Sequence, residues 1–192
     1  MKKLAIILSS VLVLGLTSKV QAQEFEEGTN IINLSIGFGS GLYNGLGYSS
    51  TIPGVGVSFE HGIVDDVIWD GVNIGVGAYF GVSGSKFEVD NPFTGTTYGY
   101  KYTYIIPAAR GAVHYSFVDG LDTYSGIHIG AQVVTSSEIG NVPPVAAGAS
   151  KGGLYASGFI GARYYFTDNI AALVELGSGI AYFNLGLTYR MD

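Results

Sequence analysis

The sequence predicts an all-β protein: an eight-stranded, antiparallel, up-and-down transmembrane β-barrel with a closed lumen that side chains fill. Apolar residues alternate with small or polar ones in eight segments, and a period of two is the pattern of a β-strand. Only 12% of the 192 residues are charged, about half of the usual ~25%. The faces opposite the apolar ones carry glycine, serine, asparagine and tyrosine, whereas a soluble β-sandwich turns charged residues to water. The apolar faces are therefore expected to meet lipid.

Residues 1–22 have the features of a cleaved secretory signal peptide. A short basic start precedes an apolar run over residues 4–16, and the small-residue pattern of a cleavage site ends at Ala22. The run is shorter than the ~20 residues of a membrane-spanning helix, which argues against a single membrane anchor. Cleavage leaves residues 23–192 as a single barrel domain with six basic and fifteen acidic residues. The resulting formal net charge of −9 argues against a nucleic-acid partner.

The eight predicted strands repeat the same alternation along the chain. Their apolar faces are, in order, Ile32, Leu34, Ile36 and Phe38; Val55, Val57 and Phe59; Val72, Ile74, Val76, Ala78 and Phe80; Ile105, Ala109, Val113 and Tyr115; Ile127, Ile129, Ala131 and Val133; Ile160, Ala162, Tyr164 and Phe166; Ala172, Val174 and Leu176; and Phe183, Leu185, Leu187, Tyr189 and Met191. Strands of roughly 8–14 residues suit a tilted membrane crossing, which takes ~9–11 residues. The small inward residues suit a narrow eight-stranded barrel.

The connections between the strands predict the topology. Export places the mature N-terminus in the periplasm, and an even number of strands returns the C-terminus there. The links at 40–53, 83–99 and 135–152 then become long outward loops, through which an extracellular ligand is expected to bind. Short turns at 119–120 and 167–169 face the periplasm, as barrels of this kind prefer.

Several segments of the mature chain carry a family resemblance. They are INLSIGFG near the N-terminus, VSFEHG at 57–62, ARGAVHY at 109–115, TYSGIHIGAQVV at 123–134 and the long stretch at 159–189. In these segments the chain resembles the small eight-stranded OmpX/OmpA-type outer-membrane barrels of Gram-negative bacteria. The resemblance implies a cell outer-membrane location after export through the periplasm, contact with outer-membrane lipid, and a monomeric barrel.

The last predicted strand adds a second resemblance. Outer-membrane barrels carry a polar residue, a glycine two positions later, and hydrophobic residues three and five positions beyond that glycine. Asn184, Gly186, Tyr189 and Met191 fit this spacing. The resemblance implies that the barrel-assembly machinery recognises this strand. The chain departs from the pattern at Asp192, where the family ends on an aromatic residue.

Five charged residues fall on the predicted inward faces: Glu60, Arg110, Arg163, Glu175 and Arg190. Arg163 and Glu175 flank one predicted turn at similar distances, so we expect them to lie near one another. An unpaired charge in a narrow, partly dry lumen is costly, so an ion-pair network is predicted. We favour a network that plugs and stabilises the barrel over a charged gate or a proton path.

Three classes of function stay open. The leading hypothesis is a structural or surface-interaction protein without catalysis, and the second is a narrow transmembrane channel for small solutes or ions. The third is a lipid-modifying outer-membrane enzyme, because the lipid A deacylases use a His-x-Ser pair with a glutamate, and His114-Tyr115-Ser116 has that spacing. Glu138 belongs to the opposite end of the barrel, so a lumen or interface role for His114 is favoured.

No cofactor or metal ion is expected. The chain has no cysteine, which excludes disulfides and thiolate metal sites, and its three histidines fall on different strands without metal-ligand spacing. One aromatic run remains ambiguous, since Tyr98, Tyr100, Tyr102 and Tyr104 share one face of their strand. This run is either an aromatic girdle or a lining of the lumen.

Overall fold

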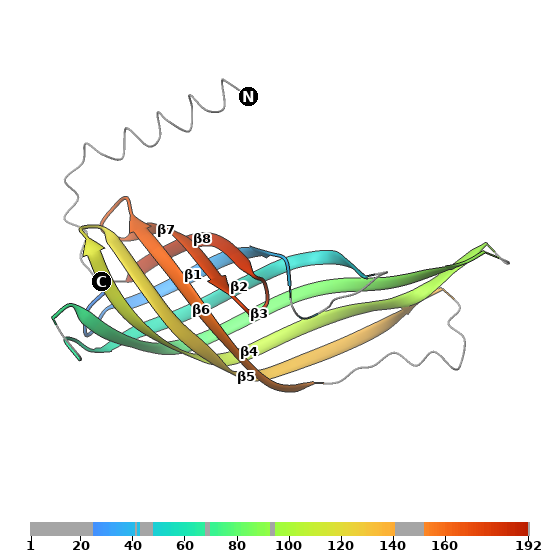
Figure 1. The fold of residues 1–192 in the computed structure, drawn as a ribbon, viewed down its shortest axis with the longest axis horizontal. Coiled ribbons are helices and arrows are strands. Elements are labelled where there is room, and N and C mark those ends of the chain that lie inside the picture. Colours follow the sequence, from blue (N-terminus) through green and yellow to red (C-terminus); the bar gives the residue numbers. More distant parts are fainter. Residues whose placement is uncertain are drawn as a thin grey trace, which may run out of the picture.

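The computed structural model describes residues 25–40, 42, 48–67, 70–92, 95–140 and 152–191, and the predicted signal peptide lies outside them. The strands are β1 (Asn30–Phe38), β2 (Tyr48–Val64), β3 (Val72–Asn91), β4 (Thr96–Val118), β5 (Leu121–Ile139), β6 (Gly153–Tyr165), β7 (Ile170–Gly177) and β8 (Phe183–Met191). Each strand pairs antiparallel with its neighbours in sequence, and β1 pairs with β8 to close the barrel (Figure 1). The predicted eight-stranded up-and-down barrel is confirmed. Among these residues there is no helix long and apolar enough to cross a membrane.

The seam between the first and last strands is regular. The β1–β8 register runs without a shift from Asn30 opposite Met191 to Phe38 opposite Phe183. The start of β1 and the end of β8 therefore lie at the same end of the barrel, together with the short turns at 119–120 and 166–169 (Figure 1).

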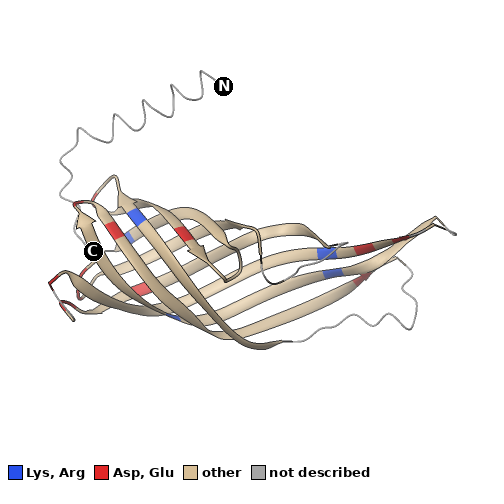
Figure 2. Ribbon diagram, viewed as in Figure 1, with Lys and Arg blue, Asp and Glu red and all other residues tan. Residues whose placement is uncertain are grey.

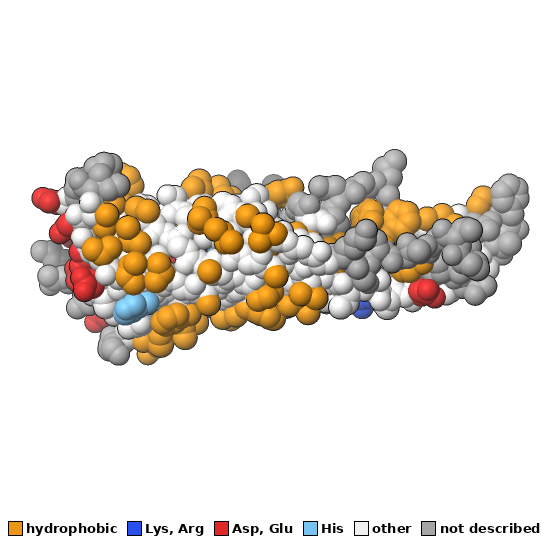
Figure 3. All heavy atoms as spheres, turned by 90° about the horizontal axis from the view of Figure 1, so that it is seen from below, with side chains coloured by type: hydrophobic (Ala, Val, Ile, Leu, Met, Phe, Trp, Pro, Cys, Tyr) orange, Lys and Arg blue, Asp and Glu red, His pale blue; other side chains and the backbone are white. Residues whose placement is uncertain are grey.

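The outer wall of the barrel is apolar, as predicted. Leu34, Ile127 and Leu187 are 59%, 55% and 56% exposed, and hydrophobic side chains are spread over the wall (Figure 3). Charged residues lie mainly in the lumen near the end with the termini, in the turns of that end, and on the long strands at the other end (Figure 2). Val72 departs from the predicted apolar outer face, because it is only 3% exposed at the start of β3, next to the β2–β3 turn.

Four strands are longer than the sequence predicts. β2, β3, β4 and β5 contain 17, 20, 23 and 19 residues, whereas strands of roughly 8–14 were expected. The predicted loop at 83–99 is almost entirely strand, because β3 and β4 pair up to Asn91 opposite Thr96. Residues 48–53 of the predicted 40–53 loop belong to β2, and residues 135–139 of the predicted 135–152 loop belong to β5. Polar threonine and tyrosine residues suggested loops, but both are good strand formers when a neighbouring strand pairs with them.

The extended parts of these strands leave the barrel as a separate sheet. β1 stops pairing with β2 at Gly37 opposite Gly54, and β2 is irregular between Ser50 and Val55. β6 begins at Gly153, opposite Gln132 of β5. Above these levels β2, β3, β4 and β5 alone continue among the described strands, and they form a projecting sheet of residues 48–53, 83–91, 96–104 and 133–139 (Figure 1).

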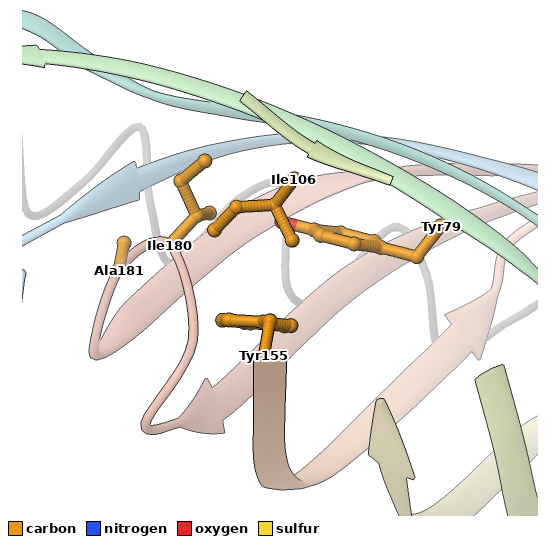
Figure 4. Close-up of a cluster of buried hydrophobic side chains, with 5 residues drawn as sticks. All are labelled: Tyr79, Ile106, Tyr155, Ile180 and Ala181. Carbon is orange, nitrogen blue, oxygen red and sulfur yellow. The ribbon is translucent and has the colours of Figure 1, made fainter. Parts of the chain in front are cut away.

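The lumen is filled by two different kinds of side chain. Near the mouth that carries the projecting sheet, Tyr79, Ile106, Tyr155, Ile180 and Ala181 come together as a buried apolar cluster (Figure 4). Ile180 and Ala181 lie in the β7–β8 connection, which folds into the mouth and leaves them 2% and 1% exposed. Nearer the termini the buried side chains are polar and charged.

Candidate functional site

Glu60 is at the centre of a buried ionic network. Inward alternation along β2 places its side chain in the lumen, where it is 0% exposed. Its Oε2 accepts a hydrogen bond from Arg110 Nε of β4 at 2.7 Å, and its Oε1 accepts one from Arg163 Nη2 of β6 at 3.1 Å. One carboxylate therefore joins three strands that are not all adjacent in the barrel.

Each arginine also binds a second carboxylate. Arg163 Nη1 donates to Asp122 Oδ2 of β5 at 2.7 Å, and Arg110 Nη2 donates to Glu175 Oε2 of β7 at 2.9 Å. Two guanidinium groups thus bridge three carboxylates. Because a buried charge is tolerated only with such partners, the whole set stabilises one arrangement of the strands.

Aromatic rings pack against the two guanidinium groups. Arg163 Cζ lies 4.0 Å from the ring centre of Tyr124, and Arg110 Cζ lies 3.8 Å from that of Phe159. These distances fall in the range of cation–π contacts. Gly161 leaves room for the tyrosine, because a Cβ atom there would lie 2.4 Å from Cζ of Tyr124.

His114 completes the network from β4. Its Nδ1 lies 3.0 Å from Asp122 Oδ1, and its Nε2 lies 3.1 Å from Glu60 Oε1. Both ring nitrogens therefore face carboxylates inside the lumen, and the residue is 2% exposed. In this orientation the imidazole has no nitrogen directed at Ser116, which argues against a His-x-Ser catalytic pair on the outer rim.

A second histidine connects the network to the apolar cluster. The ring of His128 stacks on Tyr79 at 4.4 Å and packs against Phe159 at 4.5 Å. Its Nε2 lies 3.0 Å from Arg110 Nη1, and its Nδ1 lies 3.3 Å from Ser157 Oγ. The lumen is thus occupied continuously from the ionic network to the apolar cluster.

The structure brings together four of the five charged residues that the sequence placed in the lumen, namely Glu60, Arg110, Arg163 and Glu175. The fifth, Arg190, donates from Nη2 to Thr29 Oγ1 at 3.2 Å. Arg163 and Glu175 were expected to lie near one another, and both of them contact Tyr124. Tyr124 lies between them, because its ring contacts Arg163 and its hydroxyl donates to Glu175 at 3.2 Å.

Sequence reasoning missed Asp122 as a member of the network. A signal for it exists, since Asp122 has the same strand parity as Tyr124 and His128, which also face the lumen. It was overlooked because it lies next to the predicted turn at 119–120, where a carboxylate is usually solvated.

The N-terminal segment closes the lumen beneath the network. The ring of Phe25 is 2% exposed, and its carbonyl accepts a hydrogen bond from Asn73 Nδ2 at 2.5 Å. The following turn is held by hydrogen bonds from Thr29 N to Glu26 O and from Gly28 N to Gly62 O, at 3.0 and 2.9 Å. Gly28 has a φ of +86°, a conformation that favours glycine. Residues 25–29 therefore form an N-terminal stopper in the barrel.

One cavity among the described residues of the lumen is small. A cavity of about 10 Å³ lies among Tyr155, Glu175 and Asn184, which is enough for about one water molecule. Within the described part of the chain, no group of three or more histidine, aspartate or glutamate side chains is placed to hold a metal ion.

Comparison with known proteins identifies the fold. No protein-family model matches the sequence, and no curated protein matches it significantly. The crystal structure of the outer membrane protein OprG from Pseudomonas aeruginosa is similar, with a TM-score of 0.58 at 9% identity over 91% of this chain and 100% of that chain. The Yersinia pestis attachment invasion locus protein Ail scores 0.49 at 12% identity over 86% and 99% of the two chains. The OprG similarity and the closed ring of eight strands show that this chain has the fold of the eight-stranded outer-membrane β-barrels.

Proposed function

We propose that this protein is a monomeric, non-catalytic barrel of the cell outer membrane that is sealed to solutes and presents the projecting sheet to the cell exterior. The observation that carries the proposal is the projecting sheet itself, which rises from a barrel whose lumen is filled. Such a protein acts through what its exposed sheet binds. In this proposal residues 1–22 are removed on export, and residues 23–192 form one domain.

The direction of the projection follows from the connections. Barrels of this class keep short turns on the periplasmic side and long segments on the outer side. The turns at 119–120 and 166–169 lie at the end with the termini, and the projecting sheet lies at the other end. A crossing strand needs ~9–11 residues. β4 has 23, so about half of it extends beyond the membrane.

Three layers of side chains support the sealed lumen. The N-terminal stopper occupies the periplasmic end, the ionic network around Glu60 occupies the next level, and the apolar cluster with Ile180 occupies the outer mouth. An eight-stranded barrel has room inside only for its own side chains, so a diffusion path would require all three of these layers to move.

Conductance measurements test the sealed state against the alternative of a narrow channel. The refolded protein, added to a planar lipid bilayer, is expected to give no stable openings, with a porin refolded in the same way as positive control. Reproducible openings on the nanosiemens scale would overturn the proposal and favour the channel.

The third hypothesis, a lipid-modifying enzyme, has a direct test. Because both nitrogens of His114 face Asp122 and Glu60, replacement of Ser116 by alanine is expected to leave the lipid A of the producing cells unchanged by mass spectrometry. A change in acylation that disappears in Ser116→Ala would identify an enzyme.

The last strand supports a proposal on assembly. Asn184 of β8 faces the lumen, Gly186 lies close against Leu34 of β1, and Tyr189 is 53% exposed on the outer wall. We propose that Asn184, Gly186, Tyr189 and Met191 form the signal that the barrel-assembly machinery reads. Replacing Tyr189 by alanine is expected to lower the amount of folded barrel in cells without preventing refolding of the purified chain.

A further inference from the structure

The side chains on the outer and inner faces of the barrel wall change in polarity at one level of the barrel. Val82, Ile105 and Val133 lie side by side on β3, β4 and β5 and form the last row in which all three strands have an apolar outward residue. The next rows outward are Gly84, Thr103 and Thr135, and then Lys86, Lys101 and Ser137. This level marks the outer limit of the apolar belt, because charged and polar side chains face water beyond it.

Above that level the aromatic residues lie on the inner face. The ring of Tyr48 lies 5.1 Å from Phe87 and 6.2 Å from Tyr102, and Tyr100 lies 6.2 Å from Tyr102. We call these four residues the aromatic face. The ambiguous tyrosine run is thus divided, since Tyr104 is buried in the mouth and Tyr100 and Tyr102 belong to the projecting sheet.

The aromatic face is partly exposed. β1 ends at Phe38 and β8 begins at Phe183, so among the described strands none stands opposite it. Tyr48 is 37% exposed, and the other three rings are partly exposed. Exposed clusters of aromatic side chains are enriched at the binding sites of proteins.

The charges of the projecting sheet point away from the aromatic face. Lys86 and Glu88 form an ion pair of 2.5 Å on the outer face, where Lys101 also lies. Glu138, opposite Tyr100 on β5, is the charged residue at the edge of the inner face. Partial burial raises the pKa of the Tyr102 hydroxyl, and the neighbouring phenols of the cluster add to the effect. Like an ordinary tyrosine, this group is uncharged at neutral pH.

A cavity of about 450 Å³ lies at the foot of the aromatic face, within the ~300–1,000 Å³ of small-ligand sites. Tyr48, Ser50 and Ser83 line one side, and Ile180 lies among the residues that line the rest. The exposed Ser50 hydroxyl donates to Ile52 O at 3.5 Å. A hydroxyl that donates in this way keeps its lone pairs to accept hydrogen bonds from a ligand.

We propose that the aromatic face and the cavity at its foot bind a neutral carbohydrate. A sugar ring has an apolar C–H face that packs on tyrosine and phenylalanine rings, and hydroxyls that pair with tyrosine and serine hydroxyls. The face offers both groups, and among the described residues it carries no lysine or arginine, so these residues do not complement a sulfated or phosphorylated glycan. Binding of the carbohydrate does not depend on the direction of the sheet. Its biological role rests on the proposed function, in which the sheet faces the cell exterior.

A glycan array tests the proposal with the full-length mature protein refolded in detergent. Neutral oligosaccharides (glucose, galactose, mannose and N-acetylglucosamine oligomers) and heparin are used as probes, and the strongest neutral binder is then titrated by calorimetry. Binding to at least one neutral glycan is expected. Absence of any neutral binder at millimolar concentration, or binding to heparin alone, would overturn the proposal.

Variants locate the site. Tyr48→Ala and Tyr102→Ala are each expected to raise the Kd by about tenfold, as for aromatic anchors in other interfaces. Lys86→Gln and Lys101→Gln, on the opposite face, are expected to keep the Kd within about twofold, since rim charges contribute little. Heat-modified mobility in gels establishes that each variant is folded. An equal change in Kd for the tyrosine variants and the lysine variants would contradict the placement of the binding site. The conductance test of the sealed barrel is independent of this result.

Discussion

The ring of Phe25 stacks on the imidazole of His114, with centroids 3.8 Å apart and the two planes 16° from parallel. Phe25 precedes the first strand, whereas His114 lies in β4. Because His114 also contacts Glu60 and Asp122, this contact connects the N-terminal stopper to the ionic network. The first residues that the structure describes are therefore part of the filling of the lumen.

Replacement of Phe25 by alanine is expected to lower the free energy of unfolding by about 3 kcal/mol, because it leaves a cavity beside His114. Urea unfolding in phospholipid vesicles measures the change. Phe117→Ala is the matched control, since Phe117 is 71% exposed near the same end of the barrel. Equal losses in the two variants would show that the stopper does not stabilise the fold.

Replacement of Glu60 by glutamine is expected to lower the free energy of unfolding by about 3–5 kcal/mol, because it leaves Arg110 and Arg163 without the carboxylate that joins them. Glu88→Gln is the control on an exposed ion pair with Lys86. That change is expected to cost less than about 1 kcal/mol. The same urea titration compares the two, and a Glu60 variant no less stable than the Glu88 variant would contradict the role of the network.

Replacement of two strand glycines by alanine is expected to change the stability of the barrel in opposite directions. A Cβ at Gly161 would lie 2.4 Å from the ring of Tyr124, so Gly161→Ala is expected to destabilise the barrel by about 1–3 kcal/mol. A Cβ at Gly111 meets nothing within 4 Å. Gly111→Ala is therefore expected to be neutral or stabilising by up to about 1 kcal/mol. Thermal unfolding in detergent ranks the variants, and a reversed order would refute the inward placement of Gly161.

The orientation of the barrel in the membrane can be determined by labelling single-cysteine variants, because the chain has no cysteine of its own. In Glu88→Cys the thiol lies on the projecting sheet, and in Asp119→Cys it lies in the short turn between β4 and β5. A membrane-impermeant maleimide is expected to label the first variant in intact cells and both variants after lysis. Labelling of the turn alone in intact cells would place the projecting sheet in the periplasm.

Much of the fold could be predicted because strand parity is a local property. Each alternation of apolar and polar residues assigns its members to lipid or lumen without knowledge of the partner strands. The lengths of β3 and β4 were not predictable in this way. The segment at 83–99 has the composition of a loop, and only its pairing, such as Lys86 opposite Lys101, makes it strand.

The charged residues of the lumen could also be predicted from strand parity. Parity places Glu60, Arg110, Arg163 and Glu175 in the lumen, and the structure brings these four together. The partners were not predictable, since Asp122 lies beside a turn and Phe25 belongs to no strand. The aromatic face required the structure as well, because it depends on where the opposite wall ends.

By itself, the sequence determined which side chains face lipid and which face the lumen, because an extended chain alternates its side chains with a period of two. Only the tertiary structure decided which lumen residues meet. Closure of the barrel places β2 across from β6, so that Glu60 contacts Arg163, 103 residues further along the chain. The tilt and stagger of strands in a closed ring set such contacts, and these are properties of the whole barrel rather than of any one segment.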